Sequence, residues 1–332
     1  MGVAEDVAAQ EFWAGLRLTT QARIGLGRAG DGLPTREVLE FRAAHAAARD
    51  AVHNPLDVDA LATAVSALGV GEPVHVRSRA GDRSEYLRRP DLGRLPGAVE
   101  VVAADRNVAD RVAAANSPGA RTIWSGAGLG CGDGMGMGAA GSRTDAEEVL
   151  AGVPYSGADV GFVLADGLSP RALSDHGVPM VAALMAALGD RYTFAPPVIA
   201  TQARVALGDH IGAALGVTTV LVLIGERPGL SVADSLGIYL THHPRPGRTD
   251  AERNCVSNIH PPEGLTYARA AQVTAALVDG ARRLGRSGVD LKDTSTELPS
   301  AATPLVLDAS SGRVNDIRRP GPSLVLDAVD PE

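Results

Sequence analysis

The chain has 332 residues, of which 45% are hydrophobic but only 3% aromatic, so its core must be built mainly from Val, Leu, Ile and Ala. Lys and Arg number 31 against 39 Asp and Glu, giving a net charge of −8, which argues against a nucleic-acid or anionic-membrane surface. The two cysteines, Cys131 and Cys255, lack CxxC spacing and predict no disulfide framework, as in a reducing compartment.

Residues 1–96 predict an α-rich region with one hairpin. Nothing at the start resembles a secretory signal, and no apolar run approaches the roughly 20 residues that span a bilayer. Helices are expected over residues 5–18, 35–52 and 57–68. The runs 74–79 and 84–88, joined through Gly81, predict the hairpin. The region carries many arginines, which are either solvated or face a carboxylate-rich partner: Arg17, Arg23, Arg28, Arg36, Arg77, Arg79, Arg88 and Arg89.

Residues 97–158 predict an insertion rich in glycine. Within it, Gly134, Gly136 and Ala139 match a relaxed dinucleotide-binding fingerprint. No strand ends just before this match and no helix opens just after it, so the context that the fingerprint needs is missing. A flexible insertion is therefore the expectation here.

Strand and helix patterns alternate over residues 159–292. Strands are expected over 160–165, 193–200, 217–224 and 237–241, and helices over 170–188, 209–215 and 264–283. Ser169 and Pro170 form a typical N-cap and first position of a helix. This alternation predicts an α/β fold with a Rossmann-like, doubly wound parallel sheet.

The apolar run at residues 217–224 is typical of a strand buried on both faces. Gly225 ends it, and Glu226 follows where the carboxyl end of the strand opens into a loop. Ligands of open α/β sheets bind at those ends, so Glu226 is a site candidate. A solvated turn closed by Pro228 and Gly229 is the alternative.

Residues 293–332 form a tail rich in Ser, Thr, Pro and Asp. The word LVLDA occurs at 305–309 and again at 324–328. Disorder is the simplest interpretation, and short strands or docking on a partner's edge is the other.

Several motifs resemble those of the small subunit of ethanolamine ammonia-lyase. GERPGL at 225–230 is followed by RNCVSNIH at 253–260. Five further motifs come in the family's order: ARIGLGRAG (22–30), YLRRPDLGR (86–94), ADGLSPRA (165–172), ARVALGDHIG (203–212) and SGVDLK (287–292). The resemblance covers residues 16–94 and 159–292 and is expected to fail over 97–158.

In that family a large TIM-barrel subunit holds ethanolamine and the reactive face of adenosylcobalamin, and the small subunit closes over the other side. The resemblance implies that this chain contacts the cofactor through Val205, Glu226 and Cys255, each expected on a loop at the carboxyl end of a strand. Glu226 would accept hydrogen bonds from corrin amides, Val205 would offer backbone or apolar surface, and Cys255 would pack at the rim. It also implies a hetero-oligomer with the large subunit, acting in ethanolamine catabolism.

The chain carries no complete catalytic set of its own. Ser174, Asp175 and His176 are adjacent in sequence, which does not place three side chains in a relay. His242 and His243 would point to opposite sides of an extended strand, so a shared metal is not expected. The resemblance therefore implies a non-catalytic subunit of a lyase, with no nucleic acid or membrane as partner.

Two departures from the family bear on localisation and role. Only fifteen residues precede Leu16, where the family carries a longer leader associated with bacterial microcompartments, so free cytoplasm is the stronger expectation. The insertion and the tail also lie outside the family pattern. The alternatives are a structural assembly subunit or specialised paralogue without cofactor contact, and a nucleotide-binding oxidoreductase, which would need the missing fingerprint.

Overall fold

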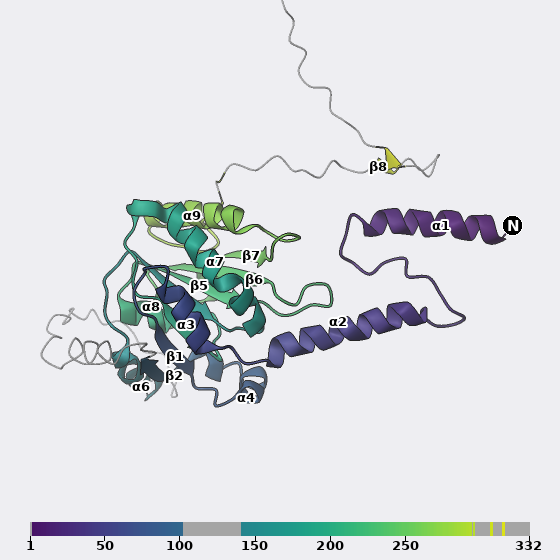
Figure 1. The fold of residues 1–332 in the computed structure, drawn as a ribbon. Coiled ribbons are helices and arrows are strands. Elements are labelled where there is room, and N and C mark those ends of the chain that lie inside the picture. The colour runs from purple at the N-terminus through teal and green to yellow at the C-terminus, as the bar shows by residue number, and fades with distance from the viewer. Residues whose placement is uncertain (1, 102–140, 294, 296–305, 308–313, 316–332) are drawn as a thin grey trace, which may run out of the picture. The chain divides into compact units, whose positions relative to one another are not determined.

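A computed structural model describes residues 2–101, 141–293, 295, 306–307 and 314–315 (Figure 1). The chain divides into two compact units, residues 1–35 with 296–332 and residues 36–295, and each is described by itself. The first unit contains α1 (Gly2–Arg17) and the pair β8 (Val306–Leu307) and β9 (Val314–Asn315). The first LVLDA word thus contributes a short strand, whereas the second lies outside the described residues, as do Cys131 and the glycine-rich fingerprint.

The second unit is a mixed α/β structure built on one seven-stranded sheet. Its strands are β1 (Val74–Ser78), β2 (Pro96–Val101), β3 (Val160–Ala165), β4 (Val198–Thr201), β5 (Thr219–Gly225), β6 (Leu236–His242) and β7 (Asn254–Ile259). Its α-helices are α2 (Thr35–His53), α3 (Val58–Ser66), α4 (Arg83–Arg88), α6 (Gly141–Val149), α7 (Pro170–Leu188), α8 (Leu207–Leu215) and α9 (Tyr267–Leu284). Among the described residues of this unit, 3-10 helices accompany them at η1 (Leu92–Arg94), η3 (Leu150–Gly152), η4 (Gly189–Arg191) and η5 (Asp250–Glu252).

The sheet has the strand order β2-β1-β4-β3-β5-β6-β7, and only part of it is parallel. Strands β1, β4, β3 and β5 run parallel, while β2, β6 and β7 join them antiparallel. Strand β6 returns antiparallel to β5 because the connection between them, residues 226–235, contains no helix to carry the chain back across the sheet. The expected doubly wound parallel sheet is therefore realised as a mixed sheet.

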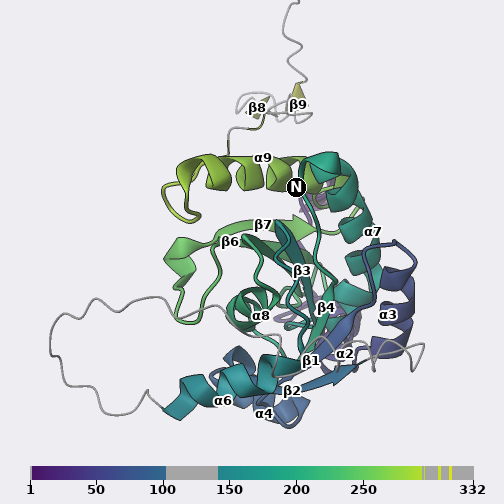
Figure 2. The ribbon, with the colours of Figure 1, turned by 90° about the vertical axis from the view of Figure 1, so that its left-hand side faces the viewer.

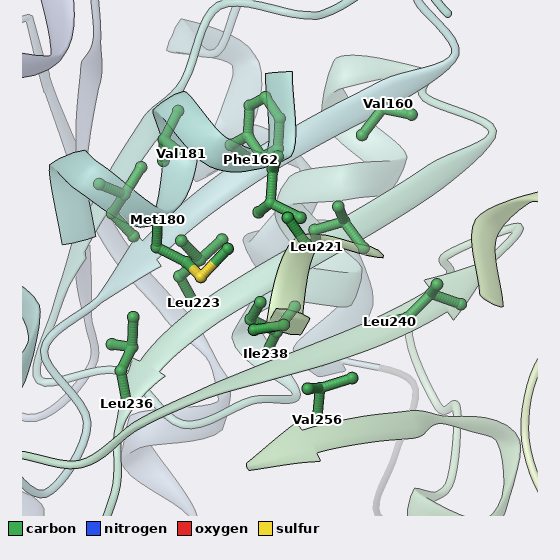
Figure 3. Close-up of a cluster of buried hydrophobic side chains, with 14 of the residues drawn as sticks. Val160, Phe162, Met180, Val181, Leu221, Leu223, Leu236, Ile238, Leu240 and Val256 are labelled. Atoms are coloured by element: carbon green, nitrogen blue, oxygen red, sulfur yellow. The ribbon is translucent and has the colours of Figure 1, made fainter. Parts of the chain in front are cut away.

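Helices cover both faces of the sheet (Figure 2). Because successive side chains of a strand point to opposite faces, the strands supply side chains to a hydrophobic core on each face. On one face, side chains of β3, β5 and β6 pack against α3, α7 and α9, forming what we call the α7–α9 core (Figure 3). On the other face, the alternate side chains of β3 and β5 pack against α8, forming the α8 core. On β5 the alternation is complete: Leu221 and Leu223 belong to the α7–α9 core, and Val220, Val222 and Ile224 to the α8 core.

Most of the expected elements of residues 159–292 are present, with shifted ends. The helix at Pro170 begins as predicted, since the side chain of Ser169 accepts a hydrogen bond from the Ala172 amide at 3.2 Å. The strand expected over 193–200 is shorter, beginning only after Pro196 and Pro197, and it lies between β1 and β3 in the middle of the sheet. Strand β7 was not predicted, although it contains most of the RNCVSNIH motif.

The predicted hairpin at 74–88 is wrong. Its first half is strand β1, but its second half is helix α4, because Asp82 caps that helix by accepting from the Glu85 amide at 2.7 Å. Glu85 in turn accepts from the Gly81 amide at 2.8 Å, so the polar residues that suggested a turn start a helix instead. The antiparallel partner of β1 is β2, which lies at the start of the segment interpreted as an insertion.

Among the described residues, one helical stretch, residues 170–191, is long and apolar enough to cross a membrane by length and composition, with a mean hydropathy of 1.3. This stretch contains α7, whose Leu173, Met180 and Leu184 are fully buried in the α7–α9 core. A central helix of a folded domain passes the same test, so the stretch is weak evidence for a membrane span.

Acid is expected to destabilise this unit through His242. Burial, together with His243, lowers the pKa of His242 to about 4, and its ring lies 3.0 Å from the Thr219 hydroxyl. The His242 ring takes up a proton near pH 6.5 in the unfolded chain but only near pH 4 in the folded chain. The contribution of neutral His242 to the free energy of unfolding is therefore present above pH 6.5 and lost as the pH falls toward 4. Urea unfolding across this range should show a shallower decline for His242→Gln than for the wild type. His45→Gln, at an exposed position on α2, should leave the wild-type decline unchanged.

Candidate functional site

The carboxylate of Glu226 lies on the α8 side of the sheet, directly after β5. It continues the alternation of Val220, Val222 and Ile224, which all belong to the α8 core. Gly225 ends the strand at a point where a side chain has no room, because a Cβ there would lie 2.0 Å from the carbonyl oxygen of Ser169. The glycine thus allows β5 to end against the start of α7, and Glu226 follows as a half-buried side chain.

Two donors, one just before β6 and one on β7, hold the Glu226 carboxylate. The Ser235 hydroxyl, just before β6, donates to Oε2 at 2.5 Å, and the Asn258 amide of β7 donates to the same oxygen at 3.3 Å. In the part of the chain that the structure describes, Oε1 accepts no hydrogen bond. Glu226 is therefore an ordered acceptor rather than the side chain of a freely solvated turn.

Cys255 lies on strand β7 and not on a loop at the carboxyl end of a strand, so that expectation is wrong. It pairs with Tyr239 of β6, which pairs with Val222 of β5, and this register places all three side chains on the α8 side. Cys255 is exposed at the edge of the sheet. The segment forms a strand because the β-ladder with β6 satisfies its backbone, a long-range pairing that the polar residues of the motif do not reveal.

Tyr239, which the sequence did not single out, pairs with Cys255 across β6 and β7. Burial, together with the Cys255 thiol and the charge of Glu226, raises the pKa of Tyr239 to about 12. Although part of Cys255 is exposed, burial also raises the pKa of its thiol, as does Glu226, against the opposing hydrogen bond from Tyr239. At neutral pH both groups are protonated, so Cys255 is a neutral contact and not a nucleophile.

Val205 lies between β4 and α8, where the carboxyl end of β4 turns into the helix. It is half-buried and packs on the α8 core, as Tyr239 does. Its carbonyl oxygen accepts from the Gly208 amide at 2.9 Å, so the exposed part that it offers is chiefly apolar. The structure thus places Val205, Glu226 and Cys255 on the same side of the sheet, with Tyr239 paired to Cys255.

A buried ion pair connects the two motifs that carry Val205 and Cys255. Arg253, just before β7, donates to both carboxylate oxygens of Asp209 on α8, at 2.5 and 2.6 Å, and also to the Thr241 hydroxyl at 2.9 Å. Both side chains of the pair are only 2% exposed. Burial lowers the pKa of Arg253, but the hydrogen bonds and charge of Asp209 more than offset this, so it remains charged. The pair therefore fixes α8 relative to β7.

His242 and His243 do not point to opposite sides as expected. His243 leaves the strand with a φ of +49°, and the two ring centroids lie 4.2 Å apart. Within the described ranges, no group of three or more His, Cys, Asp and Glu side chains is arranged to hold a metal ion.

The arginines of the N-terminal region are mostly solvent-exposed. Of the eight that the sequence singled out, Arg79 is half-buried and the others are exposed. Arg36, Arg77 and Arg89 form ion pairs with acidic residues of their own unit, at 2.7, 3.7 and 2.8 Å. The exposed arginines are therefore solvated, and three of them also form ion pairs with nearby acidic residues.

Comparison with known proteins places the chain in a family. A family model described as "Ethanolamine ammonia-lyase light chain (EutC)" matches residues 10–114 and 137–292. The chain belongs to the ethanolamine ammonia-lyase light-chain family. A relative from Rhodococcus erythropolis named "Ethanolamine ammonia-lyase small subunit" is 58% identical over 285 residues, which cover 86% of this chain and 91% of the relative. A relative of the same name from Ralstonia nicotianae is 41% identical, over 87% of this chain and 91% of the relative. Another from Rhodopseudomonas palustris is 44% identical, over 84% of this chain and 89% of the relative.

The family match extends further than the motifs suggested. It covers residues 97–114 and 137–158, where the resemblance was expected to fail, and leaves only 115–136 unmatched in the interior. Strand β2 explains part of this extension, because it completes the edge of the sheet beside β1. The recognition of the family from its motifs is confirmed, and the chain is a small subunit of the kind that forms part of this lyase.

Proposed function

We propose that this chain is the small subunit of an adenosylcobalamin-dependent ethanolamine ammonia-lyase and helps a large subunit retain the cofactor. The observation that supports this most is the Glu226 carboxylate, held in place on the same side of the sheet as Val205 and Cys255. The family membership supports the large subunit as partner, and with it a role in ethanolamine catabolism.

The residues of this surface fit a corrin with amide side chains. Corrin amides are neutral donors, and Glu226 offers a carboxylate whose Oε1 has no described donor. The protonated Cys255 and the half-buried Val205 add neutral contacts that suit the apolar parts of the ring. The buried Asp209–Arg253 pair keeps the elements that carry these two residues in register.

The division of labour follows from the chemistry of the residues present. When bound, adenosylcobalamin supplies the radical chemistry that converts ethanolamine into acetaldehyde and ammonia. Glu226 orients the cofactor, Val205 and Cys255 exclude water at its edge, and the substrate belongs to the large subunit. We further propose that the complex works in the cytoplasm, which cell fractionation with an antibody against this chain tests.

Activity is expected only in the reconstituted complex. The isolated chain should produce no acetaldehyde from ethanolamine with adenosylcobalamin present, and adding a large subunit should restore turnover. The reason is that Tyr239 and Cys255, on the same side of the sheet as Glu226, are both protonated at neutral pH and therefore supply neither a general base nor a nucleophile. A coupled assay for acetaldehyde measures this directly.

Two results would contradict the proposal. One is robust acetaldehyde production by the purified chain alone. The other is a large subunit that retains cobalamin equally well without this chain, which would favour a purely structural assembly role.

A further inference from the structure

We propose that Ser235 is a positioning residue for cobalamin: together with the Asn258 amide it holds one oxygen of Glu226, so that the other oxygen is presented to the ligand. This inference rests on the proposed function and names a further residue of the same site. It assigns a task to Ser235, at the end of the segment between β5 and β6 and beyond the motif GERPGL.

The first support is the way in which Ser235 meets Glu226. The Glu226 amide donates to the Ser235 carbonyl at 2.9 Å, which extends the β5–β6 ladder by one step. The Ser235 hydroxyl then donates to Oε2 of the same residue at 2.5 Å. Backbone and side chain of one serine therefore both fix Glu226.

The second support is the backbone of β7 at Asn258. This strand has an extra residue where it pairs with the start of β6, and Asn258 adopts a left-handed φ of +62°. Such a conformation is uncommon outside glycine and points to a local constraint. It directs the Asn258 amide to Oε2 of Glu226 at 3.3 Å, while the Asn258 side chain is bonded to His260 at 2.8 Å.

The third support is Gly237, the position over which the carboxylate lies. A Cβ built on Gly237 would come within 3.0 Å of Oε1 of Glu226. The lack of a side chain there leaves Oε1 room on the side of the sheet that also carries Tyr239 and Cys255. Three strands thus contribute to one carboxylate orientation.

A carboxylate in a solvated turn requires none of these features. Both donors use Oε2, so the arrangement leaves Oε1 as the acceptor in a fixed direction. An acceptor that is ordered beforehand loses less conformational entropy when a ligand binds. Removing the Ser235 hydroxyl should therefore weaken binding only when Glu226 is present.

A double-mutant cycle in the complete complex tests this coupling. Adenosylcobalamin affinity is measured by absorbance titration for the wild type, Ser235→Ala, Glu226→Ala and the double variant, each assembled with the large subunit. Ser235→Ala should weaken affinity by roughly 3- to 10-fold when Glu226 is present, and by less than about 2-fold in the Glu226→Ala background. Ser235→Thr, which keeps the hydroxyl, should restore wild-type affinity.

Ser174→Ala is the matched control, because its hydroxyl donates to the Pro170 carbonyl inside α7 at 3.2 Å. It should bind cofactor as the wild type does, and size-exclusion chromatography checks that every variant assembles. The positioning role would be overturned if Ser235→Ala weakened cofactor affinity equally with and without Glu226. It would also be overturned if Ser235→Ala did not weaken affinity when Glu226 is present. If Glu226→Ala itself leaves affinity unchanged, the proposed role of Glu226 in cofactor binding fails, and the inference fails with it.

Discussion

Asp209→Ala is expected to lower the free energy of unfolding by about 3–5 kcal/mol, because it leaves the Arg253 guanidinium buried without its partner. The two side chains are 2% exposed, so water cannot replace the lost carboxylate. The Thr241 hydroxyl and the Arg248 carbonyl would remain as uncharged acceptors, and the remaining carboxylate, Asp250 at 3.4 Å, is 94% exposed. Urea denaturation followed by circular dichroism measures the loss.

A second acidic partner of Arg253 provides the control. Asp250 lies 3.4 Å from the same guanidinium, but its side chain is 94% exposed. Exposed pairs contribute little, so Asp250→Ala should change the free energy of unfolding by less than about 1 kcal/mol. Similar losses in the two variants would show that burial does not determine the strength of this pair.

Glu226→Ala is expected to weaken adenosylcobalamin binding to the complex by about 10- to 100-fold. This corresponds to the roughly 1.5–3 kcal/mol of one hydrogen bond to a charged group that the cofactor covers. The free subunit should lose only about 1 kcal/mol, because the partners of the carboxylate are a serine hydroxyl and one amide near the surface. Turnover at saturating cofactor should change less than affinity does.

Equilibrium titration with adenosylcobalamin measures this effect, and thermal unfolding of the free subunit checks the fold. Asp290→Ala, which removes an exposed carboxylate after α9, should leave the affinity unchanged. If Glu226→Ala leaves the affinity unchanged, the Glu226 carboxylate has a purely local role at the end of β5.

Sequence patterns predicted the local elements well where they depend on near neighbours. Helix α7 begins at Pro170 because Ser169 caps it, and both residues are adjacent in the chain. The apolar run before Gly225 forms a buried strand, as its composition requires. The hairpin at 74–88 failed for a local reason too, since the pattern Asp82–Glu85 suits a helix cap as well as a turn.

The candidate site was only partly predictable. Glu226 could be placed on one side of the sheet from the alternation of β5 alone. Cys255 could not, because β7 exists through its pairing with β6, and the contact of Tyr239 with Cys255 follows from that register. Asp209 and Arg253 stand 44 residues apart in the chain, and no period in either motif indicates that they meet.

By itself, the sequence determined the family, the α/β class and the end of the central strand at Glu226, because motifs, hydrophobic periods and a strand-ending glycine are local properties of the chain. Only the tertiary structure decided that the sheet is mixed, that Cys255 lies on its edge strand, and that Ser235 and Asn258 share one oxygen of Glu226. These features depend on the pairing of strands that are distant in sequence, and that pairing is chosen by the packing of the whole sheet rather than by the residues of any one segment.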